Sequence, residues 1–207
     1  VLTNFHERGT VWHDFPGPSF NHCIVASAPR DARGRYVYFD PTAKSVPYSR
    51  LPSALEGGWG LVVGSPADTA LVCFPGSDAR DNVRRYEITL ALSPDLSAKG
   101  SVREAFVGQP AFTWHAYLRN ASEDERRKGL ERSIDASAAG AKATAITWPS
   151  VEDPSDSLVI TYEVAVPLPG RRMGDQLFLQ PDLRSSGSAE LFPAPRRTHD
   201  IYLEYPA

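Results

Sequence analysis

One histidine and one aspartate in the first quarter of the chain stand where they could share a proton. His22 lies in a β-rich run at 20–26 and Asp40 ends a second run at 36–40, with a turn-forming stretch between them. The two positions are symmetric about Asp31, so an antiparallel hairpin folded there would set them opposite each other. Opposed residues share one sheet face with Cβ atoms about 4.5–5.5 Å apart. The spacing therefore predicts a hydrogen bond between the Asp40 carboxylate and one imidazole nitrogen.

Such a pair supplies two of the three members of a nucleophilic triad, the general base and the carboxylate that orients it. The carboxylate fixes the imidazole tautomer and stabilises the imidazolium as it forms, while the second ring nitrogen is left to act as general base. A register shift of one residue would place His22 and Asp40 on opposite faces. The alternative is a surface histidine beside an aspartate that opens a turn before Pro41, and geometry alone leaves both interpretations open.

The motifs around the pair add a resemblance. Phe20-Asn21-His22 and Tyr38-Phe39-Asp40-Pro41-Thr42 resemble the histidine and aspartate strands of bacterial transglutaminase-like proteins. Weaker likenesses to the β-rich C-terminal region of one subgroup extend over nearly the whole chain; they are Leu51-Pro52, the run 59–63, Phe192 with Arg196 or Arg197, and the closing run 202–206.

The resemblance implies a cysteine acyl-transfer or amide-hydrolysing parent that acts on a peptide or protein without a cofactor. In that family a cysteine on an upstream helix is the nucleophile, so His22 would be the base and Asp40 the orienting residue. Family members usually carry export signals, which implies a periplasmic or secreted location.

The chain departs from the family pattern because no cysteine precedes His22. Cys23 is its strand neighbour and should point to the opposite face, while Cys73 lies in an apolar run that would keep a thiol protonated. We expect both cysteines to be free, buried, small hydrophobic residues. The chain is therefore interpreted as the C-terminal part of a longer protein, inactive alone, whose upstream segment supplies the nucleophile.

Composition excludes several other classes of function. A formal net charge of -3 without a basic stripe argues against nucleic acid as a partner, and no apolar run is long enough to span a bilayer. The five histidines lack metal-ligand spacing, and phosphate-cradling glycine motifs are missing from the sequence. We expect no metal and no nucleotide cofactor.

Hydrophobic periodicity predicts a mainly β, antiparallel fold with two short helices. Strands are expected at 60–63, 70–74, 86–92, 102–106, 143–148, 158–166, 176–179 and 201–205. One helix is centred on 112–118, and a second begins at Ser122, which forms an S-x-x-E capping box with Glu125. Trp114, His115 and Tyr117 on the first helix are interpreted as core residues, with an aromatic binding face as the alternative.

The expected organisation has two parts. Residues 1–58 would be a β-hairpin remnant of a transglutaminase-like core, and residues 59–207 a β-sandwich-like domain or curled sheet with the helices on one side. A rival interpretation is a non-catalytic binding or scaffolding module for a peptide, a glycan or a neighbouring domain, in which the His-Asp pair is vestigial. A Gly-x-Cys helix start encoded before Val1 would favour the enzyme.

Overall fold

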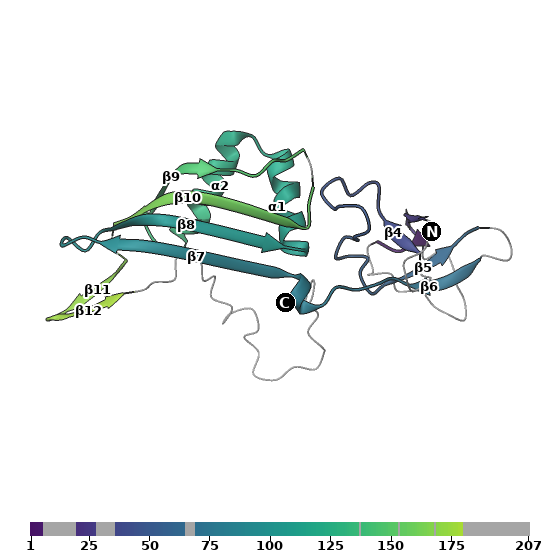
Figure 1. Cartoon of the computed structure of the whole chain (residues 1–207), viewed down its shortest axis with the longest axis horizontal. Helices are drawn as coiled ribbons and strands as arrows, with labels where there is room; N and C mark the ends of the chain where they lie inside the picture. Colours follow the sequence, from purple (N-terminus) through teal and green to yellow (C-terminus); the bar gives the residue numbers. More distant parts are fainter. Residues whose placement is uncertain are drawn as a thin grey trace.

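A computed structural model describes residues 1–5, 20–27, 36–64, 69–136, 138–152, 154–167 and 169–179. In this part of the chain the fold is mainly β, with antiparallel sheets and two α-helices, as the sequence predicts. Figure 1 shows two units side by side, a small one at the N-terminus and a larger sheet-and-helix unit. The strand predicted at 201–205 and the motif residues from Phe192 onward lie outside the described residues.

The N-terminal unit is a four-stranded antiparallel sheet in the order β2-β1-β5-β6, beside a two-stranded ribbon of β3 and β4. The strands are β1 Leu2–Thr3, β2 His22–Cys23, β3 Val25–Ser27, β4 Val37–Phe39, β5 Trp59–Val62 and β6 Ala70–Cys73. The β5–β6 pair confirms the second hairpin predicted from sequence. Residues 41–58 form turns between β4 and β5, as their proline and glycine content predicts.

This unit has a small core of its own. Its buried hydrophobic residues are Ile24, Tyr38, Leu51, Leu55 and Phe74. Because Phe74 follows β6, and β5 is hydrogen bonded to β1, the boundary expected between residues 58 and 59 falls inside the N-terminal sheet.

The larger unit is built on a second antiparallel sheet with the order β7-β8-β10-β9. Its strands are β7 Val83–Leu92, β8 Ala98–Val107, β9 Lys142–Thr147 and β10 Ser157–Val166, followed by a ribbon of β11 Gly170–Met173 and β12 Gln176–Leu179. Along β10 every second residue from Leu158 to Val166 is buried, the period expected of a sheet with one covered face. Of the two predicted arrangements, the curled sheet with helices on one side describes this unit.

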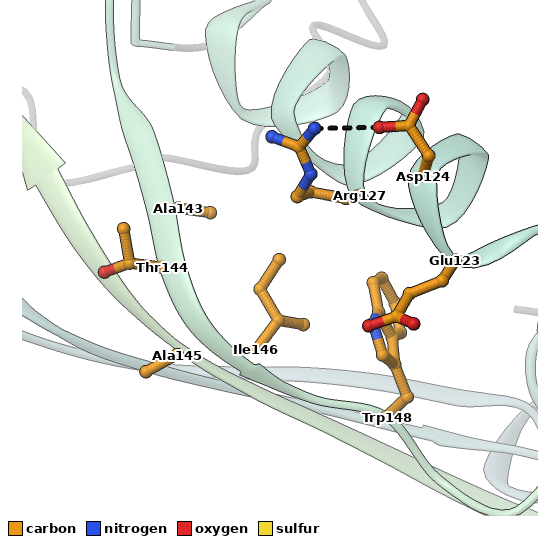
Figure 2. Close-up of a pocket in the computed structure, with 8 residues that line it drawn as sticks. All are labelled: Glu123, Asp124, Arg127, Ala143, Thr144, Ala145, Ile146 and Trp148. Carbon is orange, nitrogen blue, oxygen red and sulfur yellow. Dashed lines mark hydrogen bonds and ion pairs between the residues drawn. The ribbon is translucent and has the colours of Figure 1, made fainter.

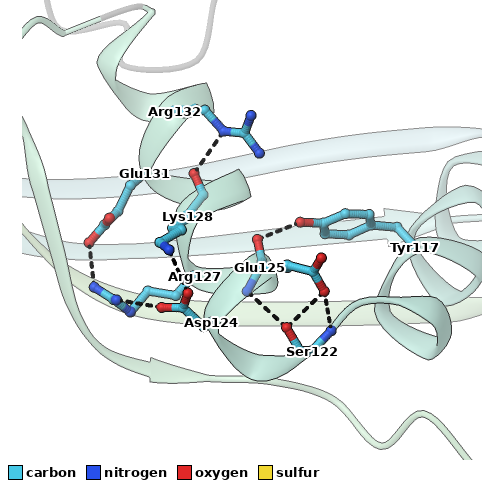
Figure 3. A network of polar contacts seen from close by, with 8 residues as sticks. All are labelled: Tyr117, Ser122, Asp124, Glu125, Arg127, Lys128, Glu131 and Arg132. Carbon is cyan, nitrogen blue, oxygen red and sulfur yellow. Dashed lines mark hydrogen bonds and ion pairs between the residues drawn. The ribbon is translucent and has the colours of Figure 1, made fainter.

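Two helices cover that face (Figure 1): α1 Gln109–Asn120 and α2 Glu123–Asp135. Pro110 stands in the first turn of α1, where its missing N–H costs nothing. Ser122 caps α2, and its hydroxyl and backbone N–H form a reciprocal pair with Glu125, as predicted (Figure 3). Leu130 and Ile134 of α2 are buried in the core of this unit.

A buried amide links the two units. Gln109 at the start of α1 donates from Nε2 to the Leu51 carbonyl oxygen at 2.8 Å and to the Glu56 carboxylate at 2.9 Å. Its backbone N–H donates to the Asn82 side chain at 2.9 Å. The 3-10 turn η1 Ala79–Asp81 leads from the first unit into β7. These bonds hold the N-terminus of α1 against the turns formed by residues 41–58.

None of the helices in the described ranges is long and apolar enough to cross a bilayer. Within the same residues, histidine, cysteine, aspartate and glutamate side chains form no cluster that could hold a metal ion.

Candidate functional site

His22 and Asp40 meet in the N-terminal unit. The imidazole Nε2 lies 2.8 Å from Asp40 Oδ2, a hydrogen-bonding distance. The Asp40 side chain is 1% exposed and the His22 side chain 20% exposed. Among the described residues nothing bonds to Nδ1 of the ring, so the pair holds one nitrogen and leaves the other available.

The strand pairing that produces this contact differs from the predicted one. Val25 pairs with Phe39 and Ser27 with Val37, so the β3–β4 ladder is symmetric about residue 32, and the predicted symmetry about Asp31 is wrong. His22 lies before this ladder, on β2, where it pairs with Thr3 of β1. The side chains still meet because an offset of two residues preserves the sheet face and leaves diagonal neighbours within reach.

Asp40 is held by the turn that follows it. Its Oδ1 accepts hydrogen bonds from the Thr42 backbone N–H at 2.9 Å and from the Thr42 hydroxyl at 2.7 Å. Burial raises the pKa of the Asp40 carboxyl, but the bonds from Thr42 and His22 outweigh it and hold the pKa below its usual value. The group is therefore a carboxylate near neutral pH and accepts from the imidazole.

His22 is positioned by its neighbours on β1 and β2. Asn21 donates to the Asn4 side-chain oxygen at 3.0 Å and accepts from the Phe5 backbone N–H at 2.8 Å. With these two hydrogen bonds in place, the Phe5 ring packs edge-on against the imidazole, with ring centroids 5.0 Å apart. Asn21 of the Phe-Asn-His motif thus positions the Phe5 ring that packs against the imidazole of His22.

Neither cysteine stands in for a nucleophile. Both are free thiols, as expected, but both are exposed, and the expectation that they are buried is wrong. On β6 it is Val72 and the following Phe74 that pack in the core, and strand alternation turns Cys73 outward. Cys73 also lies at the edge opposite β2, three strand spacings or about 14 Å away. Cys23 contacts its own neighbour, the Ile24 carbonyl, at 3.9 Å.

The aromatic residues of α1 belong to the core of the larger unit, as interpreted from sequence. Trp114 and Tyr117 are partly buried against it, and the Phe106 and Trp114 rings are 5.5 Å apart. His115 is 3% exposed. Burial lowers its pKa, as does the charge of Arg119, and nearby backbone groups of Ser155 and Ser157 only partly offset this.

A cleft of about 410 Å³ runs from the histidine site to helix α1. Phe5 and Thr42, the direct neighbours of His22 and Asp40, line one end, and α1 residues line the other. Lys44 and Arg119 also line it. Sequence reasoning did not select these two cations, because 75 positions separate them and only the packing of the two units brings them to one cleft.

A second pocket, of about 620 Å³, lies between α2 and β9 (Figure 2). Ile146 and Trp148 line it, and Ala145 adopts a positive φ of 48° where the β9–β10 register shifts. Asp124 and Arg127 on its helical wall are paired with each other at 2.8 Å. This pocket draws only on the larger unit and does not touch the His22 site.

No protein-family model, curated protein or solved structure matches this chain.

Proposed function

We propose that His22 and Asp40 are the general base and the orienting carboxylate of a cysteine acyl-transfer or amide-hydrolysing site of the transglutaminase-like kind. The observation that carries the proposal is the 2.8 Å contact between Nε2 and a carboxylate that is 1% exposed. Because Asp40 accepts from Nε2, the neutral ring is the tautomer with a lone pair on Nδ1. That nitrogen is the one placed to take a proton.

The reaction requires a cysteine thiol, and in this proposal an upstream segment of the same protein supplies it. His22 Nδ1 takes the thiol proton, and the thiolate attacks the amide carbonyl to form a tetrahedral intermediate. Collapse breaks the C–N bond, and the same imidazolium returns its proton to the departing amine, leaving a thioester. Water or a second amine then attacks the thioester, again with His22 as base, and regenerates the thiol.

The test uses the product of the complete reading frame and a glutamine-containing peptide. Ammonia release reports thioester formation, which is common to hydrolysis and transfer, and incorporation of a fluorescent primary amine reports transfer. We expect His22→Ala to lower kcat/KM by about 10³-fold or more. Asp40→Asn should lower it by about 10²–10⁴-fold, because an asparagine would favour the wrong tautomer. Absence of turnover by the unmodified protein, or activity that survives His22→Ala, would contradict the proposal.

A matched control exists on the β7–β8 turn. Asp95 accepts from the backbone N–H of Ser97 at 3.0 Å and from its hydroxyl at 2.8 Å, the same arrangement as Asp40 with Thr42 but exposed and without a histidine. Asp95→Asn should leave kcat/KM unchanged. A loss equal to that of Asp40→Asn would mean that the assay reports folding rather than the triad.

A non-catalytic binding module is the second candidate. It is supported by the exposure and placement of Cys23 and Cys73, neither of which faces His22 in the described ranges. This candidate predicts that the complete product has no amide turnover, while binding in the cleft beside Thr42 persists.

A further inference from the structure

The cleft between the two units is lined by two cations, and no carboxylate balances them among the described residues. Lys44 on the 41–58 turns and Arg119 near the end of α1 both line it, and aspartate and glutamate are absent from its described lining. Neither cation forms an ion pair with the described residues. The nearby Glu56 is engaged by Gln109 and by the Ser77 hydroxyl.

Arg119 also has an unmet hydrogen bond. Its Nε is shielded from solvent and finds no acceptor among the described residues. Because solvent does not reach Nε, a ligand in the cleft meets the two terminal nitrogens of Arg119, which are not among the buried unpaired atoms. These two nitrogens lie side by side on the planar guanidinium, a geometry that matches the two oxygens of a carboxylate.

The cleft reaches the direct neighbours of His22 and Asp40. Phe5, whose ring packs edge-on against the imidazole, and Thr42, which bonds Asp40, form its other end. A volume of about 410 Å³ lies in the range of small-ligand sites. In Figure 1 the turns after β4 face the α1 end of the larger unit.

We infer that this cleft binds a carboxylate of the peptide substrate, held between Lys44 and Arg119, so that a neighbouring amide lies toward His22. The inference rests on the proposed function and names its substrate class: a short peptide with a free carboxylate close to the amide that reacts. The carboxylate comes from a chain end or from an acidic side chain.

Binding is measured on the full chain by calorimetric titration with three peptides. They are acetyl-Ala-Gln-Ala with a free C-terminus, acetyl-Ala-Glu-Ala-amide and acetyl-Ala-Gln-Ala-amide. We expect one of the two acidic peptides to bind at least about 10-fold tighter than the neutral one, and the tighter of the two identifies the source of the carboxylate. Equal affinity for all three peptides, or no binding by any, would overturn the inference.

Substitutions at Lys44 and Arg119 test whether these two residues bind the acidic peptide. Lys44→Glu, on an exposed turn where folding is not at risk, should weaken the acidic peptide about 10-fold or more, as should Arg119→Gln. Arg119→Lys should recover part of the loss, because it keeps the charge without the planar fork. Lys99→Gln, on the exposed face of β8, is the control and should change nothing. If inorganic phosphate competes as well as the peptides do, the cleft is a general anion site and the inference fails.

The His22→Ala variant separates this inference from the proposed function. It should bind the acidic peptide as the unmodified chain does, because Lys44 and Arg119, and not His22, hold the carboxylate. Peptide binding without turnover by the complete product would refute the catalytic proposal alone, whereas turnover without preference for a carboxylate would refute this inference alone.

Discussion

Asp40 couples the histidine contact to the stability of the N-terminal unit. Its folded pKa lies below its ordinary value, so the ionised form stabilises the fold. The contribution is fully present above the unfolded pKa of about 3.9 and is lost as the pH falls through the folded pKa. Asp40 therefore makes the unit acid-sensitive.

The Asp40→Asn variant should show this dependence. We expect the free energy of unfolding to fall by about 1–3 kcal/mol near neutral pH, since bonds to a charged acceptor are replaced by weaker ones. The deficit should shrink below about pH 4, where the unmodified carboxyl protonates. Urea denaturation between pH 3 and pH 7 measures it, with Asp95→Asn as the exposed counterpart. A deficit that does not change with pH would contradict the assignment.

His115, in the other unit, links stability to pH in a higher range than Asp40 does. It is 3% exposed, its two ring nitrogens have no hydrogen-bond partner in the described part of the chain, and its folded pKa is lowered by burial. The neutral ring is thus favoured in the folded state. Stability is present above the unfolded pKa of about 6.5 and is lost as the pH falls below it.

His115→Phe should remove that loss because phenylalanine has similar volume and no proton to gain. We expect the thermal midpoint of the variant to change less between pH 7 and pH 5 than that of the unmodified chain. Thermal melts at both values test this, with Asp40→Asn as a variant that retains His115. Equal pH dependence of the unmodified and His115→Phe chains would show that His115 does not govern stability in this range.

At the scale of elements, strand pairing depends on where the backbones come closest. Gly100 on β8 pairs with Leu90 on β7, and a Cβ added there would overlap the Thr89 carbonyl oxygen. Gly76, between β6 and η1, has its nearest neighbour at 3.8 Å and would accept a methyl group.

The two glycines form a matched test. Gly100→Ala should lower the free energy of unfolding by at least about 2 kcal/mol, because the β7–β8 ladder must shift to admit the methyl group. Gly76→Ala should change it by less than about 0.5 kcal/mol. Chemical denaturation of both variants measures the contrast, and similar losses at the two positions would contradict the close approach at Gly100.

At the scale of the whole molecule, two cores are joined through polar contacts and through Val46, which packs against the core of the larger unit. The polar contacts include Gln109 with its bonds to Leu51 and Glu56, and an exposed ion pair between Arg50 and Asp156 at 3.0 Å. Exposed pairs contribute little to stability, so the buried amide dominates. The cleft proposed to bind the substrate exists only while this junction holds.

Gln109→Leu tests the junction. It leaves the Leu51 carbonyl and the Glu56 carboxylate without their donor, and we expect a loss of about 1–3 kcal/mol. Hydrogen exchange of the 55–58 amides should accelerate more than that of β8 or β10, because the change acts where the N-terminal unit is attached. Gln176→Leu on exposed β12 is the control. Uniform acceleration across both units would indicate a single cooperative core instead.

Local patterns allowed much of this protein to be predicted from its sequence. The alternation of buried residues along β10 and the capping box that begins α2 at Ser122 both depend on residues a few positions apart. A local sequence pattern is therefore enough to predict them. The contact between His22 and Asp40 was predicted for the same reason, since a short hairpin makes them near neighbours.

Tertiary structure alone decided the remaining features. The β3–β4 register differs by two residues from the predicted one, and His22 pairs with Thr3 outside that ladder. Cys73 turned outward because Phe74 filled the core. Lys44 and Arg119 came to one cleft through the docking of two units. Each of these outcomes depends on residues distant in the chain competing for the same space, and that competition is settled only when the chain packs.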